Sequence, residues 1–487
     1  MTCKGHLIGI AMLLGFVSLP AKGVGIPNLK EGEIFRVSKN IDLKGLEWHL
    51  PKGAILIGSK GGNIKNGQLI GNHCSLRNID LYNVRMKGQF KEVVVTLSKD
   101  VDSLVLNGST FTCLSIDGKG HRATITCLGK QRGADIALRN IILDCKNSSG
   151  PFLYPISEGT NRFLLEDCQF TNIPEIELLC IRGALNPEIR NCQFYGLVTK
   201  NSKRHRNTLP MIRFYGCHGD ICFDGNVINN CFGIALDGIG HSEATNNIVK
   251  ICNNVIDSVT NGGVVFNGGT IHNVTVENNR ISNVHCLGSQ FEKEAFLAEN
   301  AVINFHGFKN LRIQNNIIRD CPYAYGLDLD GTLSSDLSVC KGETATIRGN
   351  KWERVLTTIL FGVRDVQLKG NTFLYAGQSD VPAVQNGLSL NACYDITITN
   401  NSITVYRAGN EVYPIVIGQN RNRTSGTINI KGNTIKSDGD ISVMVRETFS
   451  GTVKQGGNTT ISTRTKKPLK VVDRSTKVGN ILYHLSK

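Results

Sequence analysis

A short asparagine motif returns throughout the second half of the chain, and it constrains the fold more than any other feature. Each copy is Asn-Asn or Gly-Asn followed by a pair of residues with at least one apolar member. The second Asn of the copies falls at Asn226, Asn254, Asn279, Asn316, Asn350, Asn371, Asn401 and Asn433, in steps of 21 to 37 residues. Repeats of this length are typical of solenoids. A solenoid displays one repeated face as a long groove, so the motif also indicates where to look for function.

Short segments of alternating apolar and polar residues flank each motif, as expected for β-strands. Val274-Thr275-Val276 leads into one motif, and the segment 280–284 leads out of it. Asn tolerates left-handed backbone conformations and hydrogen-bonds nearby backbone, so it suits a tight corner between strands. Cys168 and Cys192 occupy the same corner position in two earlier repeats. The pattern predicts stacked β-coils with Asn side chains bonding one another along the stack.

Over residues 40–460, these repeats resemble those of the right-handed parallel β-helix proteins, the pectate-lyase-like superfamily. The resemblance implies an all-β fold: a right-handed, single-stranded parallel β-helix with short end caps. That superfamily includes polysaccharide lyases, polygalacturonase-type hydrolases, uronan epimerases and phage tailspikes. Because one fold carries many functions, the resemblance leaves the activity open.

The N-terminus has the composition of a targeting segment. Lys4 precedes the apolar run from Leu7 to Leu19, which is too short to span a bilayer, so we expect a signal peptide over residues 1–23. We expect an N-terminal cap and the first coils over 24–130, the β-helix body with its groove over 131–446, and a C-terminal cap over 447–487. No later segment is apolar enough to cross a membrane, and the mature protein is predicted to be secreted or periplasmic.

The chain is basic and rich in cysteine. Its formal net charge is +14, and the densest basic run is Lys200–Arg206. A basic secreted protein without helical DNA-binding motifs favours an acidic polysaccharide as partner over nucleic acid. The 16 cysteines lack metal-site spacing; we interpret them as small buried residues, with one or more disulfides as the alternative.

A groove face can be predicted by aligning the strands that end in the pattern apolar-x-apolar-x-Gly. Side chains alternate across a strand, so the residues between the apolar positions face outward and form two columns. The first column contains Arg182, Tyr215, Asp237, Asn267, His306, Asp330, Gly362 and Asn391. The second contains Cys180, Arg213, Ala235, Val265, Asn304, Asp328, Leu360 and Ser389. The resemblance implies that this face binds substrate, and the predicted binding residues are Asn304, Asn267, Asp237, Tyr215, Arg213, Arg182 and Asn391.

The predicted catalytic residues are Asp328, Asp330 and His306, with Asn304 at the edge of their patch. Residues i and i+2 of a strand lie about 6.6 Å apart. Two carboxylates at about that spacing fit an inverting glycosidase, which needs one acid and one base. Their proximity would raise one pKa, and a nearby histidine can orient either group. Alternatively, Asp328 and Asp330 could hold Ca²⁺; no other metal or cofactor is predicted.

Two other functions stay open. Arg182, Arg213, Tyr215 and Asp237, with His241 and Glu243 in the following loop, could serve a polysaccharide lyase or uronan epimerase. The second open function is non-catalytic, adhesive binding of a glycan, since segment 50–72 looks similar to the first coils of tailspikes. The polygalacturonase-type pattern is not met, because His306 precedes the Asp pair and Asp-Asp is missing. The favoured prediction is hydrolysis of glycosidic bonds in an acidic polysaccharide.

Overall fold

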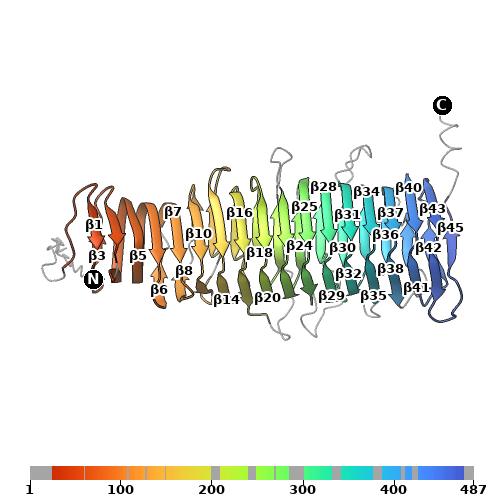
Figure 1. Cartoon of the computed structure of the whole chain (residues 1–487), viewed down its shortest axis with the longest axis horizontal. Helices are drawn as coiled ribbons and strands as arrows, with labels where there is room; N and C mark the ends of the chain where they lie inside the picture. Colours follow the sequence, from red (N-terminus) through yellow and green to blue (C-terminus); the bar gives the residue numbers. More distant parts are fainter. Residues whose placement is uncertain are drawn as a thin grey trace, which may run out of the picture.

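The computed structural model describes residues 25–475 except 60, 107–108, 127–128, 149, 199–208, 240–247, 268–269, 285–300, 332–341, 377–385, 407–411 and 419–425. The regular elements in these ranges are all β-strands, β1 to β45. They lie side by side along one long axis, with the N-terminal strands at one end and the C-terminal strands at the other (Figure 1). No helix in these ranges has the length and hydropathy required to span a membrane.

From β7 (Ser109–Asp117) onward, each coil contributes three strands to three ladders of parallel pairs. The first ladder takes β7, β10 (Asp135–Arg139) and every third strand thereafter, and the second starts at β8 (Arg122–Thr126). The third is a separate 13-stranded sheet. Before these coils, the long β5 (Asn63–Thr96) pairs with β2 (Ile41–Asp42), β3 (Glu47–His49) and β4 (Ile55–Gly58). The fold is the right-handed, single-stranded parallel β-helix that the repeats predict.

The third sheet carries the predicted groove face and is called the groove sheet below. Its strands, in order, are β9 (Gly129–Arg132), β12 (Leu153–Ile156), β15 (Leu179–Arg182), β18 (Pro210–Tyr215), β21 (Ile234–Ile239), β24 (Gly262–Asn267), β27 (Ile303–His306), β30 (Leu327–Asp330), β33 (Thr358–Phe361), β36 (Leu388–Asn391), β39 (Ile415–Ile417), β42 (Ile441–Val445) and β45 (Lys470–Asp473).

The buried Asn residues form the predicted ladder along one corner of the coils. Asn254 Oδ1 accepts hydrogen bonds from the backbone N and Nδ2 of Asn226 at 2.9 and 3.1 Å, and its own Nδ2 donates to the Phe223 carbonyl at 3.0 Å. The same three bonds recur from coil to coil as far as Asn433. Since buried amides need partners, the ladder satisfies each amide with its neighbours. The residue before each ladder Asn has a left-handed backbone (φ 57° at Asn253), which explains why that position is Asn or Gly.

Cysteine takes the ladder position in two earlier coils, as predicted. The backbone N of Cys192 donates to Asn226 Oδ1 at 2.9 Å, and the Cys168 thiol donates to the Leu138 carbonyl at 3.2 Å. Both are buried thiols, as is Cys231, whose pKa burial raises to about 12. The Cys231 thiol, held protonated by burial, is unreactive, and all three buried cysteines act as small packing residues. Cys3, Cys127, Cys286 and Cys340 lie outside the described residues.

The core consists of inward side chains stacked in register between coils. Phe266 and Phe305 stack with ring centroids 5.4 Å apart, and Trp352 and Phe373 with centroids 4.8 Å apart. Because each coil buries the same positions against the next, the apolar core is continuous along the stack. This core fixes which side chains of the groove sheet face outward.

Candidate functional site

Two adjacent coils place four polar residues in one patch. β27 and β30 pair in register, with Asn304 opposite Asp328 and His306 opposite Asp330. His306 Nδ1 lies 4.0 Å from Asp330 Oδ2. The arrangement of this carboxylate patch (Asn304, His306, Asp328 and Asp330) agrees with the columns drawn from the sequence, whereas the catalytic roles of its members stay a prediction.

Asp328 is the group in this patch best placed to hold a proton near neutral pH. Burial, and secondly the charge of Asp330, raise the pKa of Asp328 to about 7. Directly opposite, Asn304 is only 2% exposed, and among the described residues its Oδ1 has no hydrogen-bond partner. A buried acceptor favours a neighbouring donor. A protonated Asp328 offers such a donor, so the geometry and the pKa agree.

Tyr325 joins this patch although the strand alignment does not include it. It lies two residues before β30 and is half-buried. Burial, and then the charge of Asp328, raise the pKa of the Tyr325 phenol. The phenol therefore stays protonated beside the carboxylates. The alignment missed Tyr325 because it compares only residues within strands.

The predicted column of Asp237 is wrong by two residues. Asp237 pairs with Arg213 and Val265, so it lies in the column of Asn304 and Asp328, three coils from Asp328. The alignment treated Gly238 as the end of its strand, by analogy with Gly216. In fact Gly238 lies within β21, opposite Phe214. A shift of two residues leaves Asp237 facing outward, because the side-chain period of a strand is two. Ala235, which the alignment placed outward, is fully buried.

In β33 the alignment is wrong by one residue, which exchanges inside and outside. Leu360 is fully buried, whereas Ile359 and Phe361 are half-buried and lie opposite Asp328 and Asp330. Neither Leu360 nor Gly362 therefore occupies a groove column. In this register, Ile359 lies beside Asp328 and Phe361 beside Asp330. Phe361 next to Asp330 offers an aromatic surface of the kind that packs against the apolar face of a ligand.

Beyond β33 the groove becomes closed. Ser389 and Asn391 occupy the two outward columns as expected, but they are only 5% and 6% exposed. Asn391 Nδ2 donates to Ser389 Oγ at 3.2 Å. Asn391 therefore presents little surface to a ligand, contrary to the expectation that it binds substrate. The same holds for Asn304 and Asp237, which are each 2% exposed.

Arg213 is enclosed by two carboxylates. Its Nε lies 3.0 Å from Asp237 Oδ2, and its Nη1 lies 3.2 Å from Glu177 Oε1. The Glu177 contact is an ion pair without an aligned hydrogen bond. The Arg213 side chain is 23% exposed, that of Glu177 15% and that of Asp237 3%. Glu177 precedes β15, so an alignment of strand residues does not include it.

The pKa values of this triad follow from its burial. Burial raises the pKa of Asp237 to about 6 even though Arg213 opposes the rise. Burial likewise raises the pKa of Glu177. With both carboxylates ionised, they more than compensate the charge of Arg213. The triad therefore offers no free cation for an anionic sugar, which removes a role expected of Arg213.

Arg182 is exposed, in contrast to Arg213. Its Cζ lies 4.9 Å from the centre of the Tyr215 ring, and Tyr215 is 39% exposed. Both side chains are accessible to a ligand. Asn267 ends β24 opposite Ile239, and its side chain lies outside the described residues, as do Lys200–Arg206, His241 and Glu243.

Calcium at the carboxylate patch stays a prediction. Within the described ranges, no group of three or more His, Cys, Asp or Glu side chains is arranged to hold a metal ion. Ca²⁺ takes six to eight oxygen ligands, of which Asp328, Asp330 and the Oδ1 of Asn304 would supply only part.

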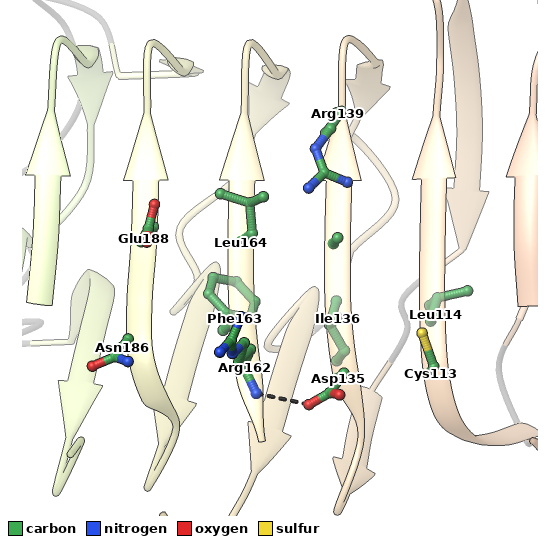
Figure 2. Close-up of a pocket in the computed structure, with 11 residues that line it drawn as sticks. Cys113, Leu114, Asp135, Ile136, Arg139, Arg162, Phe163, Leu164, Asn186 and Glu188 are labelled. Carbon is green, nitrogen blue, oxygen red and sulfur yellow. Dashed lines mark hydrogen bonds between the residues drawn. The ribbon is translucent and has the colours of Figure 1, made fainter. Parts of the chain in front are cut away.

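A hollow of about 380 Å³ lies elsewhere, on the first ladder (Figure 2). It opens over β7, β10, β13 (Arg162–Glu166) and β16 (Leu185–Arg190), and its lining includes Cys113 and Leu164. Asp135 accepts a hydrogen bond of 2.8 Å from the backbone N of Arg162, drawn as a dashed line. Its lining carboxylates Asp135 and Glu188 lie two coils apart, on β10 and β16, whereas Asp328 and Asp330 lie two residues apart on one strand. The groove sheet is therefore the better candidate.

Comparisons with known proteins show similarity in solved structures alone. No protein-family model matches the chain, and no curated protein matches it. The tailspike protein of Escherichia coli bacteriophage HK620 is similar at 12% identity and a TM-score of 0.37, over 86% of this chain and 73% of that one. A GH87 α-1,3-glucanase from Streptomyces thermodiastaticus has 11% identity and a TM-score of 0.30, over 92% and 70%. The Streptococcus pneumoniae surface adhesin PfbA has 13% identity and a TM-score of 0.31, over 85% and 92%.

Proposed function

We propose that this chain is a glycoside hydrolase that cleaves an acidic polysaccharide bound along the groove sheet. The observation that carries the proposal is the pair Asp328 and Asp330, in which burial and the neighbouring charge raise the pKa of one carboxyl to about 7. Pairs of carboxyls whose environments separate their pKa values are the usual basis of acid and base roles in glycosidases.

In this proposal Asp328 is the acid and Asp330 the base. Asp328 gives its proton to the glycosidic oxygen as the bond from that oxygen to the anomeric carbon breaks. A water molecule attacks the anomeric carbon from the opposite face, and Asp330 takes the proton that this water loses. A carboxyl spacing of about 6.5–9.5 Å leaves room for the water and inverts the anomeric centre. His306, 4.0 Å from Asp330, orients the base.

Phe361 and Ile359 support the placement of a sugar ring. They flank the carboxylates on the next coil, and sugars present apolar C–H faces that pack on aromatic rings. Arg182 and Tyr215 are the exposed residues for anionic sugars further along the groove. The basic net charge agrees with an acidic ligand. We also propose that the chain is exported by the segment 1–23.

The pairing of Arg213 is the reason to prefer hydrolysis over a lyase or epimerase reaction. Those reactions need a cation to neutralise the sugar carboxylate and a base beside it. Arg213 is already held by Glu177 and Asp237. Non-catalytic, adhesive binding remains the second candidate, because the exposed Arg182 and Tyr215 can bind a glycan without any reaction.

The test is Asp330→Asn, assayed on a panel of acidic polysaccharides by release of reducing ends and of unsaturated uronates. We expect turnover to fall by at least ~100-fold with little change in binding, since the amide keeps the shape but not the basicity of the carboxylate. Asp365→Asn, at an exposed position of β34 (Val363–Lys369), is the matched control.

Unsaturated products that depend on Arg213 would establish a lyase instead. Binding of a polysaccharide that no variant cleaves would establish the adhesive function. Loss of cleavage on chelation, restored by Ca²⁺, would assign Asp328 and Asp330 to a metal site rather than to acid and base roles.

A further inference from the structure

Four side chains at the N-terminal end of the groove sheet alternate cation and aromatic ring. Lys130 on β9 holds its Nζ 5.6 Å from the centre of the Tyr154 ring on β12. Arg182 on β15 holds its Cζ 4.9 Å from the centre of the Tyr215 ring on β18. The pKa of Arg182 is raised first of all by its interaction with the Tyr154 side chain, which links the two pairs. We call Lys130, Tyr154, Arg182 and Tyr215 the basic–aromatic strip.

The strip carries positive charge that nearby acids do not balance. Arg132, two residues from Lys130 on β9, adds a third exposed cation. In the part of the chain that the structure describes, Lys130, Arg132 and Arg182 form no ion pair, and the outward positions of β9, β12 and β15 hold no carboxylate. The nearby Glu177 is directed to Arg213. This contrasts with the neighbouring triad, in which Glu177 and Asp237 more than balance the single charge of Arg213.

The strip lies on the same sheet as the carboxylate patch but distant from it. Arg182 and Asp330 belong to the same outward column, five coils apart in the groove sheet. At about 4.8 Å per coil, that separation is about 24 Å. A mono- or disaccharide cannot span it, whereas a polysaccharide lying along the groove can contact both.

We propose that the basic–aromatic strip is a distal subsite that anchors a long acidic oligosaccharide whose scissile bond lies at the carboxylate patch. The inference rests on the proposed function for the location of that bond. Guanidinium and ammonium groups bind the carboxylates or sulfates of the sugar, and the Tyr rings pack on its apolar faces. Such an anchor makes the protein act within long chains in preference to short ones.

The cations are placed to act as anchors because their aromatic partners hold them in position. A Lys or Arg side chain loses conformational entropy when it binds a ligand, and contact with a ring reduces that loss. The interaction with Tyr154 that raises the pKa of Arg182 also favours its charged form. An anionic group therefore meets cations held in place on β9 and β15, two coils apart, rather than mobile side chains.

The experiment compares the double variant Lys130→Gln/Arg182→Gln with Lys436→Gln, a control at an exposed position of β41 (Thr434–Ser437). Binding is measured by calorimetry in the Asp330→Asn background, so that no ligand is consumed. For the long acidic polysaccharide we expect Kd to rise about tenfold, equivalent to ~1.4 kcal/mol. For a disaccharide of the same sugar that binds the carboxylate patch, we expect no change.

These readouts separate the inference from the proposed function. A tenfold loss of affinity that is confined to long acidic chains supports the role of the strip as a distal subsite, even if no polysaccharide is cleaved. An unchanged Kd, an equal loss for long and short ligands, or equal binding of a neutral polysaccharide would each overturn it. Because rings and cations also bind single-stranded nucleic acid, tighter strip-dependent binding of an oligonucleotide than of the acidic polysaccharide would overturn it too.

Discussion

Arg213 Nε lies 3.0 Å from Oδ2 of Asp237 on the adjacent coil, and this contact makes Arg213 a structural cation. From the sequence alone, the two residues are predicted to lie in different columns and both to bind substrate. In the structure they satisfy each other, together with Glu177. An ion pair this deep contributes little net stability, but breaking it leaves buried charge behind. The groove therefore contains a structural cluster of Arg213, Asp237 and Glu177. Next to it, Arg182 and Tyr215 are exposed to a ligand.

Arg213→Ala should destabilise the protein most at neutral pH. Removing the cation leaves the charges of Glu177 and Asp237 without a partner. We expect the free energy of unfolding to fall by about 2–3 kcal/mol at pH 7.5. This is less than for a fully buried pair, because Arg213 is partly exposed. At pH 5 the cost should shrink, since the pKa of Asp237 is about 6 and this carboxyl takes up a proton, while burial also raises the pKa of Glu177. Denaturation midpoints at the two pH values measure this. Arg280→Ala, at an exposed position of β26 (Arg280–Ser282), is the control, and an equal loss at both pH values would contradict the argument.

Asp328→Asn should stabilise the protein at alkaline pH. The pKa of Asp328 is about 7 in the folded protein and 3.8 ordinarily, so the folded state binds more protons between these values. Stability from this group is then fully present below about pH 4 and is lost as the pH rises through 7. Each pKa unit corresponds to about 1.4 kcal/mol, reduced here because water reaches a half-buried carboxyl.

The neutral amide avoids this loss, so the variant should melt at a higher temperature than the parent at pH 8 and at the same temperature at pH 4. Melting curves across this range provide the measurement. The control Asp365→Asn should have the same melting temperature as the parent at every pH. A lower melting temperature of Asp328→Asn at pH 8 would show that the folded protein favours the charged form.

The repeat predicts the fold because its signals are local and recur many times. A left-handed corner residue followed by a buried Asn gives the same hydrogen-bonding pattern in each coil. A misaligned repeat is therefore recognised by comparison with the repeats on either side. The inward apolar positions of β27 and β30 are equally regular. For this reason the pairing of His306 with Asp330 follows from the alignment.

The rest of the site depends on features that alternation does not encode. Gly216 ends its strand in a left-handed conformation, whereas Gly238 continues its strand, and the sequence pattern is the same for both. Phe361 faces outward although it is as apolar as an inward residue. Glu177 and Tyr325 lie ahead of their strands, and only the path of the loop brings them to the groove. Register and loop geometry therefore limited the prediction of the site.

Gly238→Ala should test the register of β21 directly. Gly238 faces the core opposite Phe266, and a methyl group there would overlap the Phe266 ring, which stacks on Phe305 and has little freedom to move. Overpacking of this kind costs about 1–3 kcal/mol. Phe266→Leu removes the overlapping ring, so the double variant Gly238→Ala/Phe266→Leu should show a smaller effect of the added methyl than the single variant does.

Gly456→Ala is the matched control, because the space around Gly456 is open and its backbone is not left-handed. Denaturation midpoints of the four proteins in the cycle, with the control alongside, give the coupling between positions 238 and 266. We expect a coupling of about 1 kcal/mol or more, since the two residues are in contact. If Gly238 instead ended its strand as Gly216 does, the coupling would be absent. Asp237 would then return to the column of Tyr215 and lose its pairing with Arg213.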